Sequence, residues 1–208
     1  MPDMSENQRL VDHLIANGVL YSPSLIEAFR RCDRILFVPE ELHPDVYDDY
    51  PLPIGIGQTI SQPSTVAIML ELLHPRPGDK VLDIGSGSGW TTALLASTVG
   101  KDGFVEGIER ISFLVEYGRR SLRKAHISNA SIDLADPSVI GKPGHLYERI
   151  LVSASAPDVP VSLFEQLKPG GILVVPVANS IWRIIKKEDG RIDTYELPGF
   201  RFVPLIVP

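Results

Sequence analysis

The sequence predicts an α/β fold in which helices cover both faces of a mostly parallel β-sheet. Between residues 80 and 176, short apolar segments alternate with segments of helical periodicity across short connections, a pattern typical of parallel sheets. The segments VLDI, RILV and ILVV consist mainly of apolar residues, as expected for strands buried on both faces. The 208 residues suffice for one core, so we expect a single domain, with an N-terminal region (residues 1–78) and a core region (residues 79–208).

The N-terminal region begins with two predicted helices that cap the core. Ser5 starts a capping box, apolar residues at helical spacing follow it, and Gly18 ends the first helix. Pro23 suits the first position of a second helix, whose apolar face carries Leu25, Ile26 and Phe29. Four prolines between residues 39 and 53 argue against long helices in 32–60, and the apolar content there predicts a packed, ordered loop. A third helix is expected over 63–73.

The core region supplies the alternating elements. We expect strands at 80–84, 104–108, 131–134, 149–153 and 172–176, with helices at 89–99, 112–125 and 161–167. After the last of these, 180–188 and 193–197 read as a hairpin around the turn at Asp189-Gly190. Residues 200–207 are expected to form a final strand.

Composition excludes several classes of function. The formal net charge of −6 argues against a nucleic-acid partner, and the single cysteine, Cys32, fits a buried structural thiol. The five histidines show no ligand spacing, so we expect no metal. No apolar run approaches the roughly 18 residues that would span a bilayer, and the N-terminus lacks a signal peptide. We therefore expect a cytoplasmic protein with no membrane partner.

The residues after the segment VLDI form a glycine loop, residues 85–89, that resembles a nucleotide cradle. Gly85, Gly87 and Gly89 alternate before a predicted helix, whose N-terminus offers free N–H groups. Trp90 fits the dinucleotide fingerprint badly, because that pattern needs close helix–strand packing there. No Gly-Lys-Ser/Thr follows, so the loop is not a P-loop either.

Two acidic residues extend this site. Glu109, at the end of the next strand, is placed to accept hydrogen bonds from both hydroxyls of a ribose. Asp136, after the third strand, is placed to accept from the exocyclic amine of adenine. For each, the alternative is a solvated carboxylate at a strand end.

The glycine loop, Glu109 and Asp136 together resemble class I S-adenosylmethionine-dependent methyltransferases, whose signature is V-L-D-x-G-x-G-x-G. The resemblance implies a Rossmann-like, seven-stranded sheet whose C-terminal hairpin carries the one antiparallel strand. It also implies S-adenosyl-L-methionine as the cofactor.

A second resemblance covers nearly the whole chain. The acceptor segment, residues 51–63, is similar to the one before the core in protein-L-isoaspartate O-methyltransferases, and so are RILFVP at 34–39, IER at 108–110, QLKPGG at 166–171 and RFVPL at 201–205. That family methylates the α-carboxylate of L-isoaspartyl residues, and possibly D-aspartyl residues, in damaged proteins and peptides. The ester then cyclises to a succinimide, which starts repair.

The resemblance implies roles for particular residues. Ser61 matches the active-site serine and would orient the acceptor carboxylate; the alternative is that it only caps the helix that begins near Pro63. The implied cofactor-binding residues are Gln58, Thr59, Ile60, Ser61, Gly85, Ser86, Gly87, Ser88, Gly89, Glu109, Arg110 and Asp136. The implied substrate-binding residues are Ile54, Gly55, Ile56, Gly57, Val203, Pro204 and Leu205. We expect a monomer whose partners are isoaspartyl-containing proteins and peptides.

One departure keeps other functions open. Where the family usually has Gly-Asp-Gly, this chain has Ala135-Asp136-Pro137, and Pro137 lacks an N–H that could contact adenine. One alternative is therefore a carboxyl methyltransferase for ordinary aspartate in a dedicated partner peptide. Another is a catalytically silent module that binds the cofactor or a peptide. A small-molecule or nucleic-acid methyltransferase is disfavoured, because no N/D-P-P-Y/F motif is present.

Overall fold

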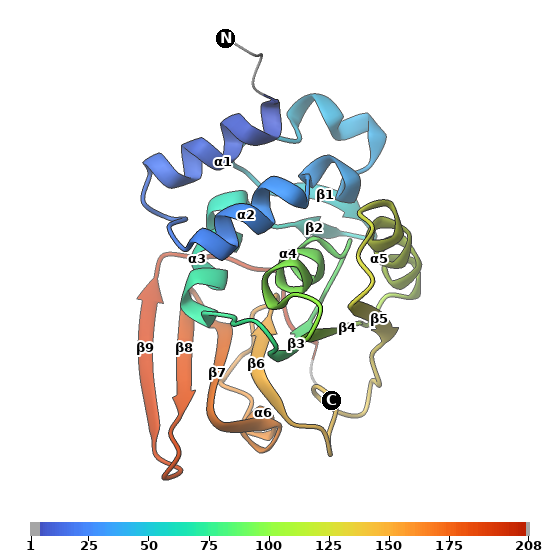
Figure 1. Ribbon diagram of the computed structural model, residues 1–208. Coiled ribbons are helices and arrows are strands. Elements are labelled where there is room, and N and C mark those ends of the chain that lie inside the picture. The colour runs from blue at the N-terminus through green and yellow to red at the C-terminus, as the bar shows by residue number, and fades with distance from the viewer. Residues whose placement is uncertain (1–4, 207–208) are drawn as a thin grey trace.

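The computed structural model, which describes residues 5–206, is built on a seven-stranded sheet (Figure 1). Its order is β5-β4-β3-β6-β7-β8-β9. Strands β3 to β7 pair in parallel, β8 is antiparallel to both of its neighbours, and the predicted single reversed strand is confirmed. The strands are β3 (Lys80–Ile84), β4 (Phe104–Glu109), β5 (Ala130–Leu134), β6 (Tyr147–Val152), β7 (Leu167–Val177), β8 (Ser180–Lys186) and β9 (Ile192–Pro198).

Along these strands, alternate residues point to opposite faces of the sheet and pack into two separate apolar cores. Val81, Val105 and Leu151 belong to the larger core, to which the first five helices contribute. These helices are α1 (Glu6–Ala16), α2 (Pro23–Arg31), α3 (Pro63–Leu73), α4 (Trp90–Val99) and α5 (Ser112–Lys124). Leu82 and Ile150 face the smaller core on the other side, together with α6 (Ser162–Glu165). Helices therefore cover both faces, but unequally.

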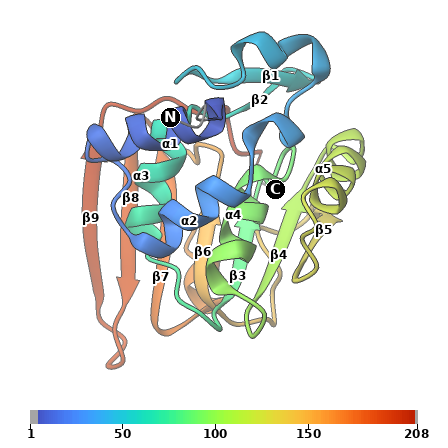
Figure 2. The same cartoon turned by 45° about the horizontal axis from the view of Figure 1, so that its top comes forward.

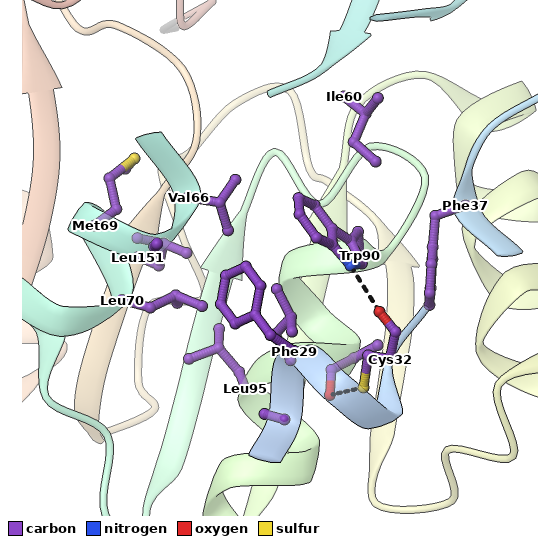
Figure 3. Close-up of a cluster of buried hydrophobic side chains, with 14 of the residues drawn as sticks. Phe29, Cys32, Phe37, Ile60, Val66, Met69, Leu70, Trp90, Leu95 and Leu151 are labelled. Carbon is purple, nitrogen blue, oxygen red and sulfur yellow. Dashed lines mark hydrogen bonds between the residues drawn. The ribbon is translucent and has the colours of Figure 1, made fainter. Parts of the chain in front are cut away.

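The N-terminal helices begin where the sequence predicts. The Ser5 hydroxyl accepts a hydrogen bond from the backbone N–H of Gln8, which caps α1, and Pro23 is the first residue of α2. Helix α2 packs on α4, which lies against β3 and β4. Figure 3 shows the core between them, where Phe29 of α2 meets Trp90 at the start of α4.

The segment expected to be an irregular packed loop contains more structure than predicted. Two 3-10 helices, Arg34–Phe37 and Glu40–Asp45, precede a two-stranded antiparallel hairpin, β1 (Leu52–Gly55) and β2 (Gln58–Ile60). Figure 2 shows this hairpin beyond the carboxyl ends of β3 and β4. The acceptor segment is therefore a hairpin placed over the edge of the sheet where parallel strands end.

Two predictions near the C-terminus are wrong. The helix expected over 161–167 is a single turn, because Leu167 begins β7 and pairs with Tyr147. The final strand expected over 200–207 is not a strand within residues 200–206, and Val207 lies outside the described residues. This tail instead crosses the ends of the strands, where Pro204 forms one isolated bridge with Ser155.

No helix within residues 5–206 is both long enough and apolar enough to cross a membrane.

Candidate active site

A cavity of about 350 Å³ opens at the carboxyl ends of the parallel strands. This is the edge at which open α/β sheets bind ligands. Residues from the sheet, the β1–β2 hairpin and the C-terminal tail line it together. Of the residues singled out in the sequence, it brings together Gln58, Thr59, Gly85, Gly87, Glu109, Arg110 and Asp136, with Ile54, Val203, Pro204 and Leu205.

The glycine loop forms the floor of this first cavity. Its glycines have positive φ angles, 79° at Gly85, 53° at Gly87 and 91° at Gly89, which other L-residues rarely adopt. The N–H groups of Gly85 and Ser86 both donate to the carbonyl of Ile108, 2.8 and 3.2 Å away, so the loop is anchored to β4. The loop is thus fixed before any ligand binds.

Glu109 anchors the same loop through its side chain. One carboxylate oxygen accepts from the N–H of Gly87 at 3.1 Å and the other from the N–H of Ile111 at 2.9 Å. The side chain is buried, yet it lines the cavity. Each carboxylate oxygen has a second lone pair available, so the predicted contact with ribose hydroxyls remains compatible with these bonds.

Asp83 lies buried beneath the loop. One carboxylate oxygen accepts from the hydroxyls of Thr91 and Thr92, both at 2.7 Å. The other oxygen, and the hydroxyl of Ser86, are buried without a hydrogen-bond partner among residues 5–206. Burial raises the pKa of Asp83 to about 6, although the threonine hydroxyls act in the opposite direction. Buried polar atoms of this kind normally find a partner. The Ser86 hydroxyl also lines a small cavity next to the loop, so it fits a polar ligand there.

Asp136 and Pro137 form part of the opposite wall. The carboxylate of Asp136 accepts from the N–H and the hydroxyl of Ser138, at 2.9 and 2.6 Å, and these bonds lower its pKa. Asp136 lines the cavity as expected, but it also stabilises its own turn.

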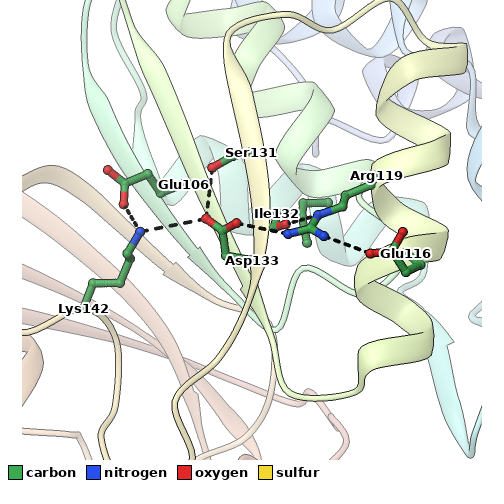
Figure 4. Close-up of polar contacts among 7 residues, drawn as sticks. All are labelled: Glu106, Glu116, Arg119, Ser131, Ile132, Asp133 and Lys142. Atoms are coloured by element: carbon green, nitrogen blue, oxygen red, sulfur yellow. Dashed lines mark hydrogen bonds and ion pairs between the residues drawn. The ribbon is translucent and has the colours of Figure 1, made fainter.

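The loop between β5 and β6 carries this wall and is anchored on the far side. Figure 4 shows Lys142 between Glu106 and Asp133, with Nζ–O distances of 2.6 and 4.0 Å. Burial raises the pKa of Glu106, but hydrogen bonds from Lys142, Lys80 and Tyr147 outweigh it and lower the value to about 2. Lys142 is therefore paired with an ionised carboxylate at neutral pH.

A second cavity, of about 290 Å³, lies beside the first. Ser61 lines it. Thr59, Ser153 and Val203 line both cavities, so these three residues lie where the cavities meet. The cap of helix α3 is Gln62 rather than Ser61, and the carboxylate of Asp49 accepts from the N–H of Ser64 at 2.8 Å. Within residues 5–206 the Ser61 hydroxyl has no hydrogen-bond partner, so the alternative that Ser61 only caps the helix is wrong.

Some of the singled-out residues lie elsewhere. Ile60, Ser61, Ser86 and Ser88 line a small cavity of about 40 Å³ next to the glycine loop. Gly89 lines none of these three cavities; a Cβ there would lie 3.0 Å from Ile132, so its role is close packing. The hairpin turn Gly55, Ile56 and Gly57 also lines none of them, and Ile56 is 63% exposed.

Sequence reasoning missed several residues at the site. Ser153 and Thr65 line the second cavity but lie outside the segments that carry the resemblance. Gln62 and Arg201 also line it; they belong to those segments, but the sequence assigned no role to them. Gly118, in the middle of α5, supports the glycine loop from below. A Cβ at Gly118 would lie 2.7 Å from Ile132 Cδ1 and 3.1 Å from the carbonyl oxygen of Gly87. A glycine inside a helix costs stability, and this was the one signal that could have identified it.

No group of three or more His, Cys, Asp or Glu side chains in the described portion of the chain is arranged to hold a metal ion.

Comparisons with known proteins agree with one another. The sequence model of the family described as protein-L-isoaspartate(D-aspartate) O-methyltransferase matches residues 5–207. The chain is 47% identical over 204 residues to a protein-L-isoaspartate O-methyltransferase of Methanopyrus kandleri, covering 96% of this chain and 90% of that one. It is 45% identical over 204 residues to the corresponding protein of Pyrococcus horikoshii, covering 96% and 92%.

Among solved structures, the fold resembles a Plasmodium falciparum protein described as a protein-L-isoaspartate O-methyltransferase in complex with S-adenosyl-L-homocysteine. The TM-score is 0.84 at 26% sequence identity, and the match covers 97% of this chain and 99% of that chain.

The packing of Gly118 leads to a first prediction. Gly118→Ala should displace the carbonyl of Gly87, and overpacking of this kind costs about 1–3 kcal/mol. We expect the dissociation constant for S-adenosylmethionine to rise about tenfold, equivalent to about 1.4 kcal/mol, by calorimetry. Arg123→Ala, on the exposed side of α5, is the control and should bind normally. Equal affinity of the Gly118 variant and the wild type would contradict the packing argument.

The burial of Asp83 leads to a second prediction. Because its pKa is raised, ionisation makes the folded state less stable as pH rises from about 4 to about 6, by about 3 kcal/mol for a two-unit shift. Asp83→Asn cannot ionise and avoids this loss. The stability of the variant minus that of the wild type should therefore be about 3 kcal/mol larger at pH 8 than at pH 4. The measurement is denaturant unfolding at both pH values, with Asp102→Asn, an exposed residue, as the control. Parallel pH profiles for wild type and Asp83→Asn would rule this account out.

Proposed function

Because the chain belongs to the protein-L-isoaspartate(D-aspartate) O-methyltransferase family, we propose that its two adjoining cavities bring S-adenosylmethionine together with an isoaspartyl residue. The activity is methyl transfer to the α-carboxylate of isoaspartyl residues in damaged proteins, and the resemblance noted in the sequence is thereby confirmed. The observation that carries the proposal for the site is the meeting of the two cavities at Thr59, Ser153 and Val203, beside Ser61.

The first cavity fits the cofactor. Its volume of about 350 Å³ lies in the range of small-molecule sites, and it combines a fixed glycine loop with the buried carboxylate of Glu109. When bound, S-adenosylmethionine supplies an electrophilic methyl group on a positively charged sulfur. Glu109 would accept from the ribose hydroxyls, and Asp136 would lie at the adenine end. The partnerless hydroxyl of Ser86, which lines the small cavity beside the glycine loop, would serve the polar methionine end.

The second cavity fits the acceptor. A carboxylic acid has a pKa of about 4, so the α-carboxylate of an isoaspartyl residue is already ionised at neutral pH. The site therefore needs no strong general base. The Ser61 hydroxyl, free of partners among the described residues, would donate to one carboxylate oxygen and direct the other toward the methyl group.

Orientation and dehydration would supply the rate enhancement. Holding two reactants in line can contribute about 7–11 kcal/mol in favourable cases. Attack of a carboxylate on a sulfonium cancels two charges, which a site with little water favours. The C-terminal residues Val203, Pro204 and Leu205 line the first cavity and would help to exclude water there. The exposed backbone of β1, paired only with β2 among the described strands, would bind an extended substrate.

We propose, further, that the chain acts as a single domain and as a monomer. Its N-terminal region (residues 1–78) supplies the acceptor segment, and its core region (residues 79–208) holds the cofactor. D-aspartyl residues are a second substrate class. Nucleic acid and membranes are not partners, in keeping with the net charge of −6, and the protein works in the cytoplasm.

The substrate assignment is tested with labelled S-adenosylmethionine and matched peptides that differ only in carrying isoaspartate or aspartate. We expect label on the isoaspartyl peptide alone, as a base-labile methyl ester. Label on the aspartyl peptide alone would favour the alternative of a dedicated partner peptide. A base-stable product would exclude carboxyl methylation, and no transfer to either would favour a silent binding module.

The role of Ser61 leads to a further prediction. A hydrogen bond to a charged group contributes about 1.5–3 kcal/mol, so Ser61→Ala should lower kcat about 10- to 100-fold. The dissociation constant for S-adenosylmethionine should change less than about threefold, because the cofactor keeps its glycine loop and Glu109. Ser22→Ala is the control: it removes a hydroxyl that donates to Glu71, and neither residue lines either cavity, so kcat should be unchanged. An unchanged kcat for Ser61→Ala with both substrates saturating would remove Ser61 from the mechanism.

A further inference from the structure

We propose that Arg34 is a positioning residue that fixes the place from which the Ser61 hydroxyl reaches the acceptor. It would do so by fixing the base of the β1–β2 hairpin against Trp90, the residue that follows the glycine loop. This inference rests on the role of Ser61 proposed above. It assigns a function in the reaction to a side chain that lines none of the three cavities at the site.

The guanidinium of Arg34 holds both ends of the hairpin. Its Nη2 donates to the carbonyl of Tyr50, just before β1, at 3.0 Å, and to the carbonyl of Ser61, just after β2, at 3.1 Å. Its Nη1 donates to the carbonyls of Val46 and Asp48 at 2.7 and 3.1 Å. One cation therefore fixes the two legs of the hairpin and the segment that leads into it.

Arg34 is also held against the cofactor side of the site. Its guanidinium carbon lies 5.4 Å from the ring centroid of Trp90, a distance at which cation–π attraction operates. Trp90 is itself immobilised: its Nε1 donates to the carbonyl of Cys32 at 3.0 Å, and Phe29 meets the ring edge-on (Figure 3). Arg34 thus fixes the position of Ser61 relative to Trp90, the first residue of α4.

A second anchor acts on the other side of Ser61. Asp49 lies within the segment that Arg34 holds, and its carboxylate accepts from the N–H of Ser64. The start of helix α3 is therefore fixed to the same segment. The backbone at Ser61 is therefore held on both sides: Arg34 binds the Ser61 carbonyl, and Asp49 binds the start of the helix that follows. Its hydroxyl is left free of partners within residues 5–206. The held backbone therefore fixes the position of the Ser61 Cβ, and the hydroxyl keeps its rotation about χ1 for a bound carboxylate.

The arrangement requires an arginine. Arg34 is fully buried, with 0% of its surface exposed. Burial lowers its pKa to about 10, so it stays charged at neutral pH. A planar guanidinium presents donors in a fixed fork, whereas a lysine ammonium is a single point on a flexible stem. Lysine would keep the charge but would release some of the four carbonyls and the flat contact with Trp90.

The test compares Arg34→Lys with Arg149→Lys. Arg149 is a matched control: it is 4% exposed and donates to the carbonyls of His74 and Glu148, and it lines none of the site cavities. Both variants should lose thermal stability. Only Arg34→Lys should lower kcat with both substrates saturating, by about ten- to a hundredfold, the effect of a displacement of about 1 Å at a reacting group. Its KM for S-adenosylmethionine should change less than about threefold.

The same substitution in a Ser61→Ala background separates positioning from general damage. If Arg34 acts through the Ser61 hydroxyl, Arg34→Lys should have no further effect on kcat once that hydroxyl is gone. An equal loss of kcat in both backgrounds, or a loss no greater than that of Arg149→Lys, would overturn the inference. An unaffected kcat in Ser61→Ala alone would instead refute the proposed role of Ser61.

If Arg34→Lys does not fold, Trp90→Phe provides the test. It removes the hydrogen bond to Cys32 and reduces the aromatic face opposite Arg34. We expect a loss of kcat in the same direction that also vanishes in the Ser61→Ala background. Trp90→Phe with wild-type kcat would overturn the inference.

Discussion

The close approach of the glycine loop to helix α5 and to Glu109 is the constraint on which the rest of the site depends. The carbonyl of Gly87 lies where a side chain at Gly118 would collide with it, and the N–H of Gly87 donates to Glu109. On the loop side, a Cβ at Gly89 would lie 3.3 Å from the carbonyl oxygen of Gly118, so glycines stand on both sides of this contact. These contacts place the loop at the carboxyl ends of the strands with its amides already oriented, so binding a ligand requires no ordering of the loop.

The second half of the site comes from a different stretch of the chain. The hairpin that ends at Ser61 belongs to the N-terminal region and is not a continuation of the sheet. Its place relative to the glycine loop depends on side chains that bridge the two regions, chiefly Arg34 and Trp90. Arg34 donates to four carbonyls through Nη1 and Nη2, while its buried Nε has no partner among residues 5–206. Removing the guanidinium would destabilise the fold, since these carbonyls would lose their donors. The same bonds that stabilise this region can therefore fix catalytic geometry.

The sequence predicts the features of this molecule that depend on neighbouring residues. Helix α1 begins at Ser5 because a cap is a local interaction, and the buried strands are recognisable because both of their faces are apolar. The β1–β2 hairpin escaped prediction because its strands are short and contain Pro53 and Gly55. The tail at 200–206 is apolar but packs across strand ends, and Pro204 has no N–H to donate. In the site, motifs identified the glycine loop, Glu109 and Ser61. The sequence assigns no role to Arg34, Gly118 or Ser153. Arg34 lies in the segment RILFVP and Gly118 is a glycine within a helix, but their importance arises from contacts between distant segments.

Ala135 and Pro137 stand where the family resemblance predicts glycines, in the wall of the first cavity that carries Asp136. Other contacts fix the shape of this wall. Asp136 uses one of its carboxylate oxygens to hold Ser138 and leaves the other for a ligand. The loop that follows is held from outside the cavity: the Gln166 side chain donates to the carbonyl of Ile140 and accepts from the N–H of Lys142. A proline reduces the conformational freedom of the unfolded chain as well. The wall thus gains a fixed shape from its anchors, and Pro137 removes one backbone donor from the cavity without loosening the residues around it.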